Sequence, residues 1–227
     1  GRAETNALAA NVRQALSGLN LALVMSHLAC ADEPMHPLNR AQLERFRAAL
    51  AMLPPAPASL AATAGIELGK DFLFDMVRPG LGLYGGNPVP ARPNPYRRVV
   101  TLTAAILQTR RIEAGETVGY GATFTAARPT LLAVTAAGYA DGLLRASGGR
   151  GHAAIGGVRV PFAGRISMDL ATLDVTALAE ERVHTGTEVE FLGDAITLEE
   201  AAAAAGTINH EILTALSPRA ERVYSES

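Results

Sequence analysis

A proline-rich stretch near the middle of the chain separates two halves with different patterns. Residues 85–95 read GGNPVPARPNP, and a proline can neither donate a backbone hydrogen bond nor continue a helix. A segment of this kind interrupts any helix or strand that reaches it and is typical of a linker between domains. We therefore predict a first domain over residues 1–86, a linker over residues 87–98 and a second domain over residues 99–227.

Helical and strand patterns alternate in the first half. Apolar residues recur at helical spacing in two segments, which predicts helices over Glu4–Leu19 and Asn39–Leu53, the second with Asn39 as its N-cap. A short helix is expected to begin at Thr63. Continuous apolar runs predict strands over Leu21–Met25, Ala58–Ala62 and Phe72–Tyr84. This alternation predicts parallel β/α units, in which functional groups gather at the carboxyl ends of the strands.

Short apolar stretches separated by turn signals fill the second half. They predict strands over Val99–Gln108, Leu131–Ala137, Leu173–Val175 and Glu188–Leu192, with a hairpin at Ile155–Val158. Two helices are then expected over Thr197–Ala205 and Ile208–Leu216, followed by a last strand over Val223–Ser225. Thr197 and Glu200 have the spacing of a capping box. The pattern predicts a small antiparallel barrel or sandwich.

The composition excludes several classes of function. A formal net charge of -2 offers no basic surface to nucleic acid, and no window approaches the roughly 18 consecutive apolar residues of a membrane span. Cys30 is the only cysteine, which excludes a disulfide within the chain and a thiolate metal site. We therefore expect a cytoplasmic protein without a metal, a nucleic-acid partner or a membrane partner.

One tyrosine stands between two glycines in the second half. Residues 118–124 read VGYGATF, which places Tyr120 inside a run that otherwise resembles a strand. Glycine on both sides permits unusual dihedrals, so the phenol can be presented at a surface as a catalytic or ligand-binding group. The same residues also fit a bulge or a tight turn with a half-buried aromatic ring. The motif alone leaves both interpretations open.

Arg78 interrupts an apolar segment of the first half. A buried guanidinium needs partners for its N–H donors, so Arg78 either binds a ligand group or belongs to a polar network. His27 lies at the end of the preceding β/α unit and can supply one partner. Asp32 follows His27 in the same loop and is either a loop cap or a site residue.

Thr63 and Gly65 lie at a junction between a strand and a helix. A hydroxyl and free amides at such a junction suit a phosphate group, although threonine is also an ordinary N-cap. Lys70 is the only lysine of the sequence, and its position between Gly69 and Asp71 indicates a solvated loop residue.

Two further segments of the second half combine glycine with polar residues. Residues 138–142 read GYADG, with Arg145 shortly after, and predict a strand that ends in a tight turn. Residues 164–169 read GRISMD, which places an arginine, a methionine and an aspartate beside a glycine. Taken singly, a hairpin with an aromatic flank explains the first segment and a surface ion pair explains the second.

In their order along the chain, these segments resemble the alanine racemase family. The matching motifs are SHLACADEP, LAATAG, DMVRPGLGLYG, VGYGATF, AGYADG, GRISMD and INHEILTALSPR. Each motif is modest by itself, but the ordered set covers essentially the whole chain. The resemblance implies the later part of a (β/α)8 TIM-type barrel that binds pyridoxal 5'-phosphate, followed by a β-rich C-terminal domain.

The resemblance also implies an activity and an assembly. It implies interconversion of L-alanine and D-alanine by two-base proton transfer on a substrate bound to pyridoxal 5'-phosphate, with D-alanine supplied for peptidoglycan. Members of the family are homodimers with shared active sites. The lysine that forms the Schiff base with the cofactor lies on earlier barrel strands, and Lys70 does not occupy its motif. Because the chain opens with Gly1 inside a helical pattern, we expect a companion N-terminal segment to carry that lysine.

The motifs assign roles to individual residues by resemblance. Tyr120 matches the tyrosine base that serves the active site of the partner subunit. Arg78 matches the arginine that faces the pyridine nitrogen, and His27 matches the histidine that supports this arginine. Thr63 falls at the phosphate-binding hydroxyl, with backbone amides from Gly80 and Leu81. The residues that match the substrate entrance are Asp32, Tyr139, Arg145, Arg165, Met168 and Asp169.

Two positions depart from the family pattern. Ala62 stands where many relatives have asparagine, and Pro218 stands where some have a tyrosine that contacts the phosphate. Two alternatives to alanine racemase stay open. One is an amino-acid racemase of broad specificity, and the other is a catalytically silent fragment that lacks the cofactor lysine.

Overall fold

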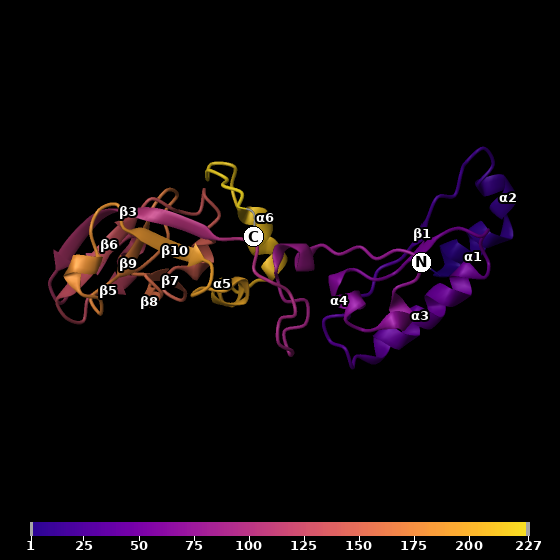
Figure 1. Cartoon of the computed structure of the whole chain (residues 1–227), viewed down its shortest axis with the longest axis horizontal. Helices are drawn as coiled ribbons and strands as arrows, with labels where there is room; N and C mark the ends of the chain where they lie inside the picture. The colour runs from indigo at the N-terminus through magenta and orange to yellow at the C-terminus, as the bar shows by residue number, and fades with distance from the viewer. Residues whose placement is uncertain (1, 226–227) are drawn as a thin grey trace. The chain divides into compact units, whose positions relative to one another are not determined.

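The computed structural model describes residues 2–225 and divides the chain into two compact units, with the division after Arg97. Figure 1 follows the chain by colour, from indigo in the first unit to yellow at the end of the second. Each unit has a hydrophobic core of its own. The two units are therefore described separately.

The first unit is built around a βαβ arrangement. Its elements are α1 (Arg2–Ala10), α2 (Val12–Ala15), β1 (Val24–Met25), α3 (Pro37–Leu50), β2 (Ala58–Ser59) and α4 (Thr63–Ile66). Strands β1 and β2 pair in parallel, with Val24 opposite Ala58, and α3 connects them. The core of the unit includes Leu43 and Phe46 of α3 together with Leu60, next to β2. The predicted parallel β/α unit is confirmed here.

The helix boundaries of this unit differ from the prediction at two places. The expected helix over Glu4–Leu19 is broken at Asn11 into α1 and α2. Helix α3 begins at Pro37, and its N-cap is His36, whose Nδ1 accepts the amide of Leu38 at 3.1 Å. The prediction of Asn39 as N-cap was wrong. Asn39 lies inside the helix, where it is buried and donates to the carbonyl of Glu33.

The apolar run over Phe72–Tyr84 does not form the expected strand. It begins at the end of a 3₁₀ turn, Lys70–Phe72, and ends in a second one, Leu81–Tyr84, with a single parallel bridge between Arg78 and Ala62. The segment runs beside β2 but binds it irregularly, because the Asp75 carboxylate accepts the amide of Ala58 at 2.8 Å. Pro79 then supplies no donor for a ladder. The Asp75 side chain and Pro79 therefore prevent regular strand pairing along this segment.

The second unit is a mainly antiparallel β structure. Its strands are β3 (Leu102–Ile112), β4 (Thr117–Val118), β5 (Phe124–Thr125), β6 (Thr130–Thr135), β7 (His152–Ile155), β8 (Val158–Pro161), β9 (Ala171–Asp174) and β10 (Glu188–Leu192). Six of these strands form one sheet in the order β8-β7-β10-β3-β6-β9, and β4 pairs with β5 in a separate hairpin. The long strand β3 pairs with β10 on one side and with β6 on the other.

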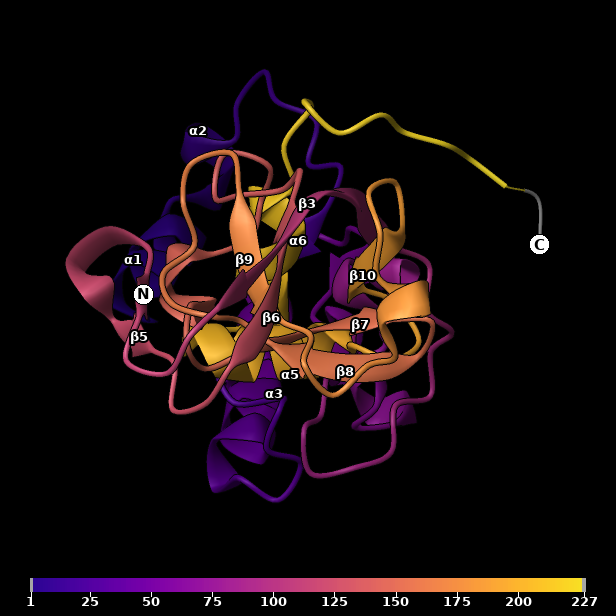
Figure 2. The same ribbon diagram turned by 90° about the vertical axis from the view of Figure 1, so that its left-hand side faces the viewer.

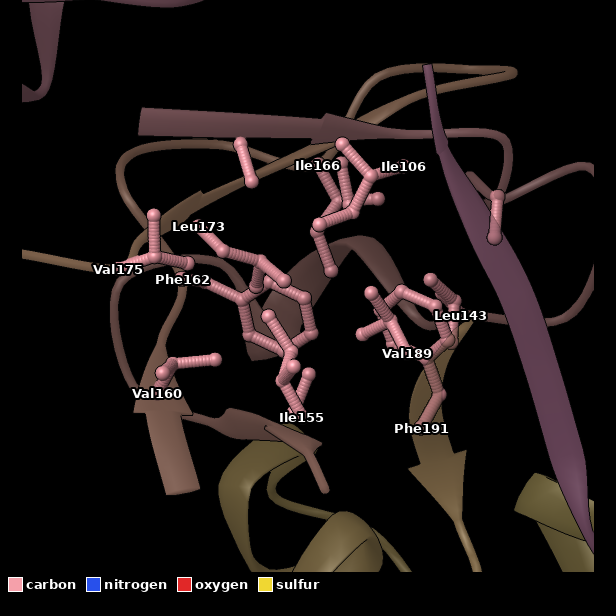
Figure 3. Close-up of a cluster of buried hydrophobic side chains, with 14 of the residues drawn as sticks. Ile106, Leu143, Ile155, Val160, Phe162, Ile166, Leu173, Val175, Val189 and Phe191 are labelled. Atoms are coloured by element: carbon pink, nitrogen blue, oxygen red, sulfur yellow. The ribbon is translucent and has the colours of Figure 1, made fainter. Parts of the chain in front are cut away.

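The six-stranded sheet nearly closes on itself. An antiparallel bridge joins Phe162, directly after β8, to Leu173 of β9, so the two edge strands approach each other. In Figure 2 the six strands surround a common centre. Figure 3 shows how side chains from these strands fill that centre, among them Ile106, Val160 and Val189, which are fully buried. Of the two architectures expected for this half, the barrel is confirmed.

Two helices, α5 (Leu198–Ala205) and α6 (Asn209–Ala215), lie at the same end of the barrel (Figure 1). The capping box predicted at the start of α5 is present, because Thr197 and Glu200 each bind the backbone amide of the other. The hairpin at Ile155–Val158 is also confirmed. The prediction of a strand over Val223–Ser225 was wrong. These residues form no strand, and Val223 and Tyr224 are exposed.

Candidate functional site

The guanidinium of Arg78 is held by groups from the ends of both strands of the first unit. Its Nη1 donates to the Ser59 hydroxyl at 2.6 Å, and its Nη2 donates to the carbonyl of Ser26 at 2.7 Å. Its Nη2 also lies 3.3 Å from Nδ1 of His27, which supports the partner predicted from the sequence. Ser26 and Ser59 lie at the carboxyl ends of β1 and β2. Arg78 is thus fixed where the functional groups of parallel β/α units gather.

Thr63, at the start of α4, forms the centre of a second group in this unit. The side chain is buried, and its Oγ1 accepts the amides of Gly80 at 2.9 Å and Gly82 at 3.3 Å. With both acceptor positions used, the hydroxyl hydrogen remains available to donate outward. The amide of Leu81 donates to no acceptor within residues 2–225. Together these donors suit an anion such as a phosphate.

The ring of Tyr96 lies beside this group. A Cβ on Gly82 would lie 2.8 Å from a ring carbon of Tyr96 and 2.9 Å from Cγ2 of Thr63, so only glycine fits there. The Tyr96 hydroxyl donates to Glu67 at 2.8 Å. Burial, together with this hydrogen bond and the negative charge of Glu67, raises the pKa of the Tyr96 phenol to about 12. Tyr96 therefore stays neutral at physiological pH, and its ring packs beside Gly82.

Tyr120 occupies a protruding turn of the second unit. Strands β4 and β5 form a hairpin, and residues Tyr120–Ala122 connect them as a 3₁₀ turn. The flanking glycines have positive φ angles, 74° at Gly119 and 75° at Gly121, which other residues rarely adopt. Tyr120 is 71% exposed. Of the two interpretations left open by the sequence, the structure favours presentation of the phenol at a surface.

The Tyr120 turn lies against the GRISMD segment. A Cβ on Gly121 would lie 3.0 Å from Nη1 of Arg165, and a Cβ on Gly164 would lie 3.0 Å from the carbonyl oxygen of Val118. The chain therefore brings the Arg165 guanidinium next to the turn that carries Tyr120.

Tyr139 and Met168 lie on two loops that touch through their backbones. The amide of Tyr139 donates to the carbonyl of Ser167, and the amide of Ala140 donates to that of Met168, both at 2.9 Å. Tyr139 and Met168 are 41% and 54% exposed, so both residues present atoms to solvent. Two of the residues that match the substrate entrance are thus neighbours in the fold.

The remaining predicted residues lie at the surface. Arg145 is exposed at the start of a 3₁₀ turn. Asp32 is exposed, and its carboxylate accepts no hydrogen bond from the rest of residues 2–225, so the interpretation as a loop cap was wrong. Lys70 is exposed, as predicted for a solvated residue. Asp169 forms an ion pair, although its partner is Arg219 at 2.7 Å and not a residue of its own motif.

Sequence reasoning missed several residues that complete these groups. Ser26 and Ser59 hold Arg78, but a serine at a strand end is too common to single out. Tyr96 lies in the segment that was interpreted only as a linker. Arg219 closes the last matching motif, INHEILTALSPR, and this place in the ordered set is the one signal that pointed to it.

The described part of the chain contains little else that resembles a site. Among residues 2–225 no cluster of histidine, cysteine and acidic side chains has the arrangement of a metal site. None of its helices combines the length and the apolar character that crossing a membrane requires. A cavity of about 280 Å³ lies in the second unit, between α5 and the barrel core, and is lined in part by Phe162, Phe191 and Ala201.

Two family models define the class to which this fold and these groups belong. Residues 2–88 match the model of the alanine racemase N-terminal domain, and residues 99–224 match that of the C-terminal domain. The chain belongs to the alanine racemase family.

Individual relatives agree with this assignment. The chain is 50% identical over 212 residues to a catabolic alanine racemase of Agrobacterium fabrum, with 93% of this chain and 55% of that protein covered. It is 52% identical over 204 residues to an alanine racemase of Methylobacterium nodulans, with 90% and 55% covered. The chain thus spans about half the length of these relatives.

The same family appears among solved structures. A crystal structure of alanine racemase from Bartonella henselae, with covalently bound pyridoxal phosphate, superposes with a TM-score of 0.93 at 39% identity. A biosynthetic alanine racemase from Pseudomonas aeruginosa superposes with a TM-score of 0.90 at 35% identity. In each comparison 99% of this chain and 62% of the other chain are covered.

Proposed function

We propose that the protein containing this chain is an alanine racemase that interconverts L-alanine and D-alanine with pyridoxal 5'-phosphate as cofactor. The observation that carries this proposal is the presentation of Tyr120 on a glycine-flanked turn, where the residue is 71% exposed. A base that must reach a substrate needs this exposure, and the positive φ angles of the glycines on either side allow the turn that presents the phenol. Family membership and the relatives of about 50% identity support the same activity.

The residues of the first unit fit the cofactor. The Thr63 hydroxyl and the amide of Leu81 are donors that suit its phosphate, and the space beside Gly80 is open, because a Cβ there would meet nothing within 4 Å. Arg78, held by Ser59 and Ser26, would face the pyridine ring. Bound pyridoxal phosphate supplies an electron sink that makes the α-proton of an amino acid removable.

The chain's own residues then have distinct roles. Arg78 orients the cofactor and keeps its positive charge, since a guanidinium does not readily give up a proton. His27 supports Arg78 from a distance of 3.3 Å. Oη of Tyr120 would take a proton from the substrate in one direction of the reaction and return one in the other, and racemisation needs a second base on the opposite face of the substrate. We assign that second role to a lysine of a companion N-terminal segment.

The architecture of the intact protein follows from the same proposal. Residues 1–86 would complete the last part of a (β/α)8 barrel, residues 87–98 would link it to the β-rich domain, and residues 99–227 would form that domain. Tyr120 would serve the active site of the partner subunit in a homodimer. Tyr139, Met168 and the other entrance residues would limit the size of the substrate. We also propose a cytoplasmic enzyme that supplies D-alanine for peptidoglycan.

The first experiment asks what the purified material contains. Intact mass under denaturing conditions would detect a companion polypeptide, and visible absorbance would detect bound pyridoxal phosphate. We then expect racemisation of L-alanine, with Tyr120→Phe slowing the reaction by at least about a hundredfold because the proton acceptor is removed.

Tyr224→Phe is a matched control, because Tyr224 is also exposed and lies outside the segments that carry the proposed chemistry. L-serine and L-lysine, tested beside L-alanine, distinguish a racemase of broad specificity. An intact protein that binds the cofactor and racemises no amino acid would refute the proposal, as would a fully active Tyr120→Phe variant.

A further inference from the structure

Arg219, which follows α6, bridges two carboxylates on different loops of the second unit. Its Nη2 lies 2.7 Å from Oδ1 of Asp169, and its Nε lies 3.3 Å from Oδ1 of Asp141. Asp169 directly follows Met168, and Asp141 lies two positions after Tyr139. We call Asp141, Asp169 and Arg219 the Arg219 bridge. Neither Asp141 nor Arg219 has a role in the chemistry proposed above.

Asp141 is the most enclosed member of the Arg219 bridge, with a side chain that is only 15% exposed. Its Oδ2 accepts the amide of Gly138 at 2.9 Å, and its carbonyl accepts the amide of Ser217 at 3.2 Å. A carboxylate bound by a backbone amide on one oxygen and a guanidinium on the other has little freedom to move. Asp141 therefore ties the Tyr139 loop to the segment that carries Arg219.

The two loops are in close contact where they meet. A Cβ on Gly138 would lie 2.2 Å from the carbonyl oxygen of Met168, so the backbones of the loops are in direct contact. On the other side, a Cβ on Gly142 would lie 2.9 Å from the carbonyl oxygen of Ala215, at the end of α6. The positions of Tyr139 and Met168 relative to each other thus depend on how firmly these segments are held.

We propose that Arg219 is a positioning residue that fixes the separation of the Tyr139 and Met168 loops, and thereby the width of the substrate entrance. A guanidinium suits this task because its planar fork contacts two carboxylates from different directions, whereas an ammonium offers a single point of charge. The entrance role of Tyr139 and Met168 rests on the function proposed above. The contacts of the Arg219 bridge are features of the structure and do not depend on that proposal.

The test uses the intact protein and four variants. Arg219→Gln and Asp169→Asn remove one charge of the bridge, and Arg219→Lys keeps the positive charge without the fork. Arg111→Gln is the matched control, because Arg111 forms an ion pair with Glu180 of similar exposure elsewhere on the second unit. Hydrogen exchange at the amides of Tyr139 and Ala140 reports loop separation without any assay of activity, and steady-state kinetics with L-alanine and L-serine report the width of the entrance.

We expect these amides to exchange at least about fivefold faster in Arg219→Gln and Asp169→Asn, because their acceptors lie on the other loop. In Arg219→Gln the KM for L-alanine should rise about tenfold with a smaller change in kcat, because a misplaced entrance weakens substrate positioning. The ratio of kcat/KM for L-serine to that for L-alanine should also rise. Arg219→Lys should restore part of each effect, and Arg111→Gln should match the unsubstituted protein.

Two results would overturn the proposal. One is an Arg219→Gln variant whose exchange and kinetics match those of Arg111→Gln. The other is faster exchange with no change in KM or in the preference for alanine, which would make the bridge a structural contact alone. A lack of racemase activity in the unsubstituted protein is distinguishable from both, because it counts against the proposed function and leaves the exchange result to be read independently.

Discussion

Nη2 of Arg78 lies 3.3 Å from Nδ1 of His27, although 51 positions separate the two residues in the sequence. The same guanidinium donates to the buried Ser59 hydroxyl at 2.6 Å and to the Ser26 carbonyl at 2.7 Å. Arg78 therefore joins the ends of β1 and β2 as well as facing the proposed cofactor site. A change at this residue should affect stability as well as chemistry.

We expect Arg78→Lys to lower the free energy of unfolding by about 1 to 3 kcal/mol, because one ammonium cannot reach all of these acceptors. Urea denaturation followed by circular dichroism measures the change. Arg45→Lys is the control, since Arg45 is exposed on α3 and should shift stability by less than about 0.5 kcal/mol. Equal stability of the two variants would show that the Arg78 network contributes nothing to folding.

The space around Gly82 yields a prediction about cofactor binding. Alanine at this position would place its Cβ 2.9 Å from Cγ2 of Thr63 and 2.8 Å from the Tyr96 ring, so Thr63 must shift. We expect Gly82→Ala to weaken the affinity of the intact protein for pyridoxal phosphate by about tenfold or more, a cost of the size seen for overpacking. Titration followed by visible absorbance measures this affinity.

Thr63→Ser provides the matched test of the same explanation. It keeps the hydroxyl that binds Gly80 and removes the Cγ2 that Gly82→Ala would strike. Thr63→Ser alone should bind the cofactor normally, and the double variant should recover part of the lost affinity. No recovery would mean that Gly82→Ala acts by another route.

Regular hydrogen-bonding patterns explain why much of the fold was predictable. Alternation and turn residues predicted β10, the Ile155–Val158 hairpin and the capping box of α5, because each depends on residues close together in the sequence. The run over Phe72–Tyr84 was misjudged because the Asp75 carboxylate takes the place of a strand partner at Ala58. Such a contact depends on tertiary structure, which local pattern does not carry.

The candidate site divides in the same way. An unusual turn at Tyr120 was predictable, because the glycines on both sides of it can adopt backbone dihedrals that other residues rarely adopt. The Arg219 bridge was not, because Asp141 and Arg219 are distant in sequence and each alone is an ordinary surface residue. The ion pair of Asp169 shows what the sequence could not predict. The sequence suggested a surface ion pair at Asp169 but gave no means of choosing Arg219 over Arg165 as its partner.

The alanines of α5 should allow the second unit to be stabilised. Ala201 lines the cavity of about 280 Å³ that also contacts Phe162 and Phe191. We expect Ala201→Leu to raise the free energy of unfolding by about 0.5 to 2 kcal/mol, because the added carbons fill apolar space. Calorimetry of thermal unfolding measures the effect. Ala205→Leu is the control, since Ala205 packs against the same core without lining the cavity, and an equal gain in both variants would contradict cavity filling.

The capping box of α5 should make stability depend on pH. Burial alone would raise the pKa of Glu200, but hydrogen bonds from the Thr197 backbone and from Arg159 outweigh it and lower the pKa below its usual value. A carboxyl whose pKa is lower in the folded state stabilises the fold above its unfolded pKa of about 4.3. This contribution is lost as the pH falls through the lower folded value.

We therefore expect Glu200→Gln to reduce the free energy of unfolding by roughly 0.5 to 1 kcal/mol near neutral pH. This value lies at the lower end of the range for the loss of a helix cap, because solvent screens a side chain that is 42% exposed. The difference from the unsubstituted protein should shrink as the pH falls from about 5 to about 3, since protonation removes the same charge from the native residue. Urea denaturation at several pH values measures this difference. Glu44→Gln, which removes an exposed carboxylate from α3, should show no such trend, and a Glu200→Gln effect that persists unchanged at low pH would mean that the cap acts without its charge.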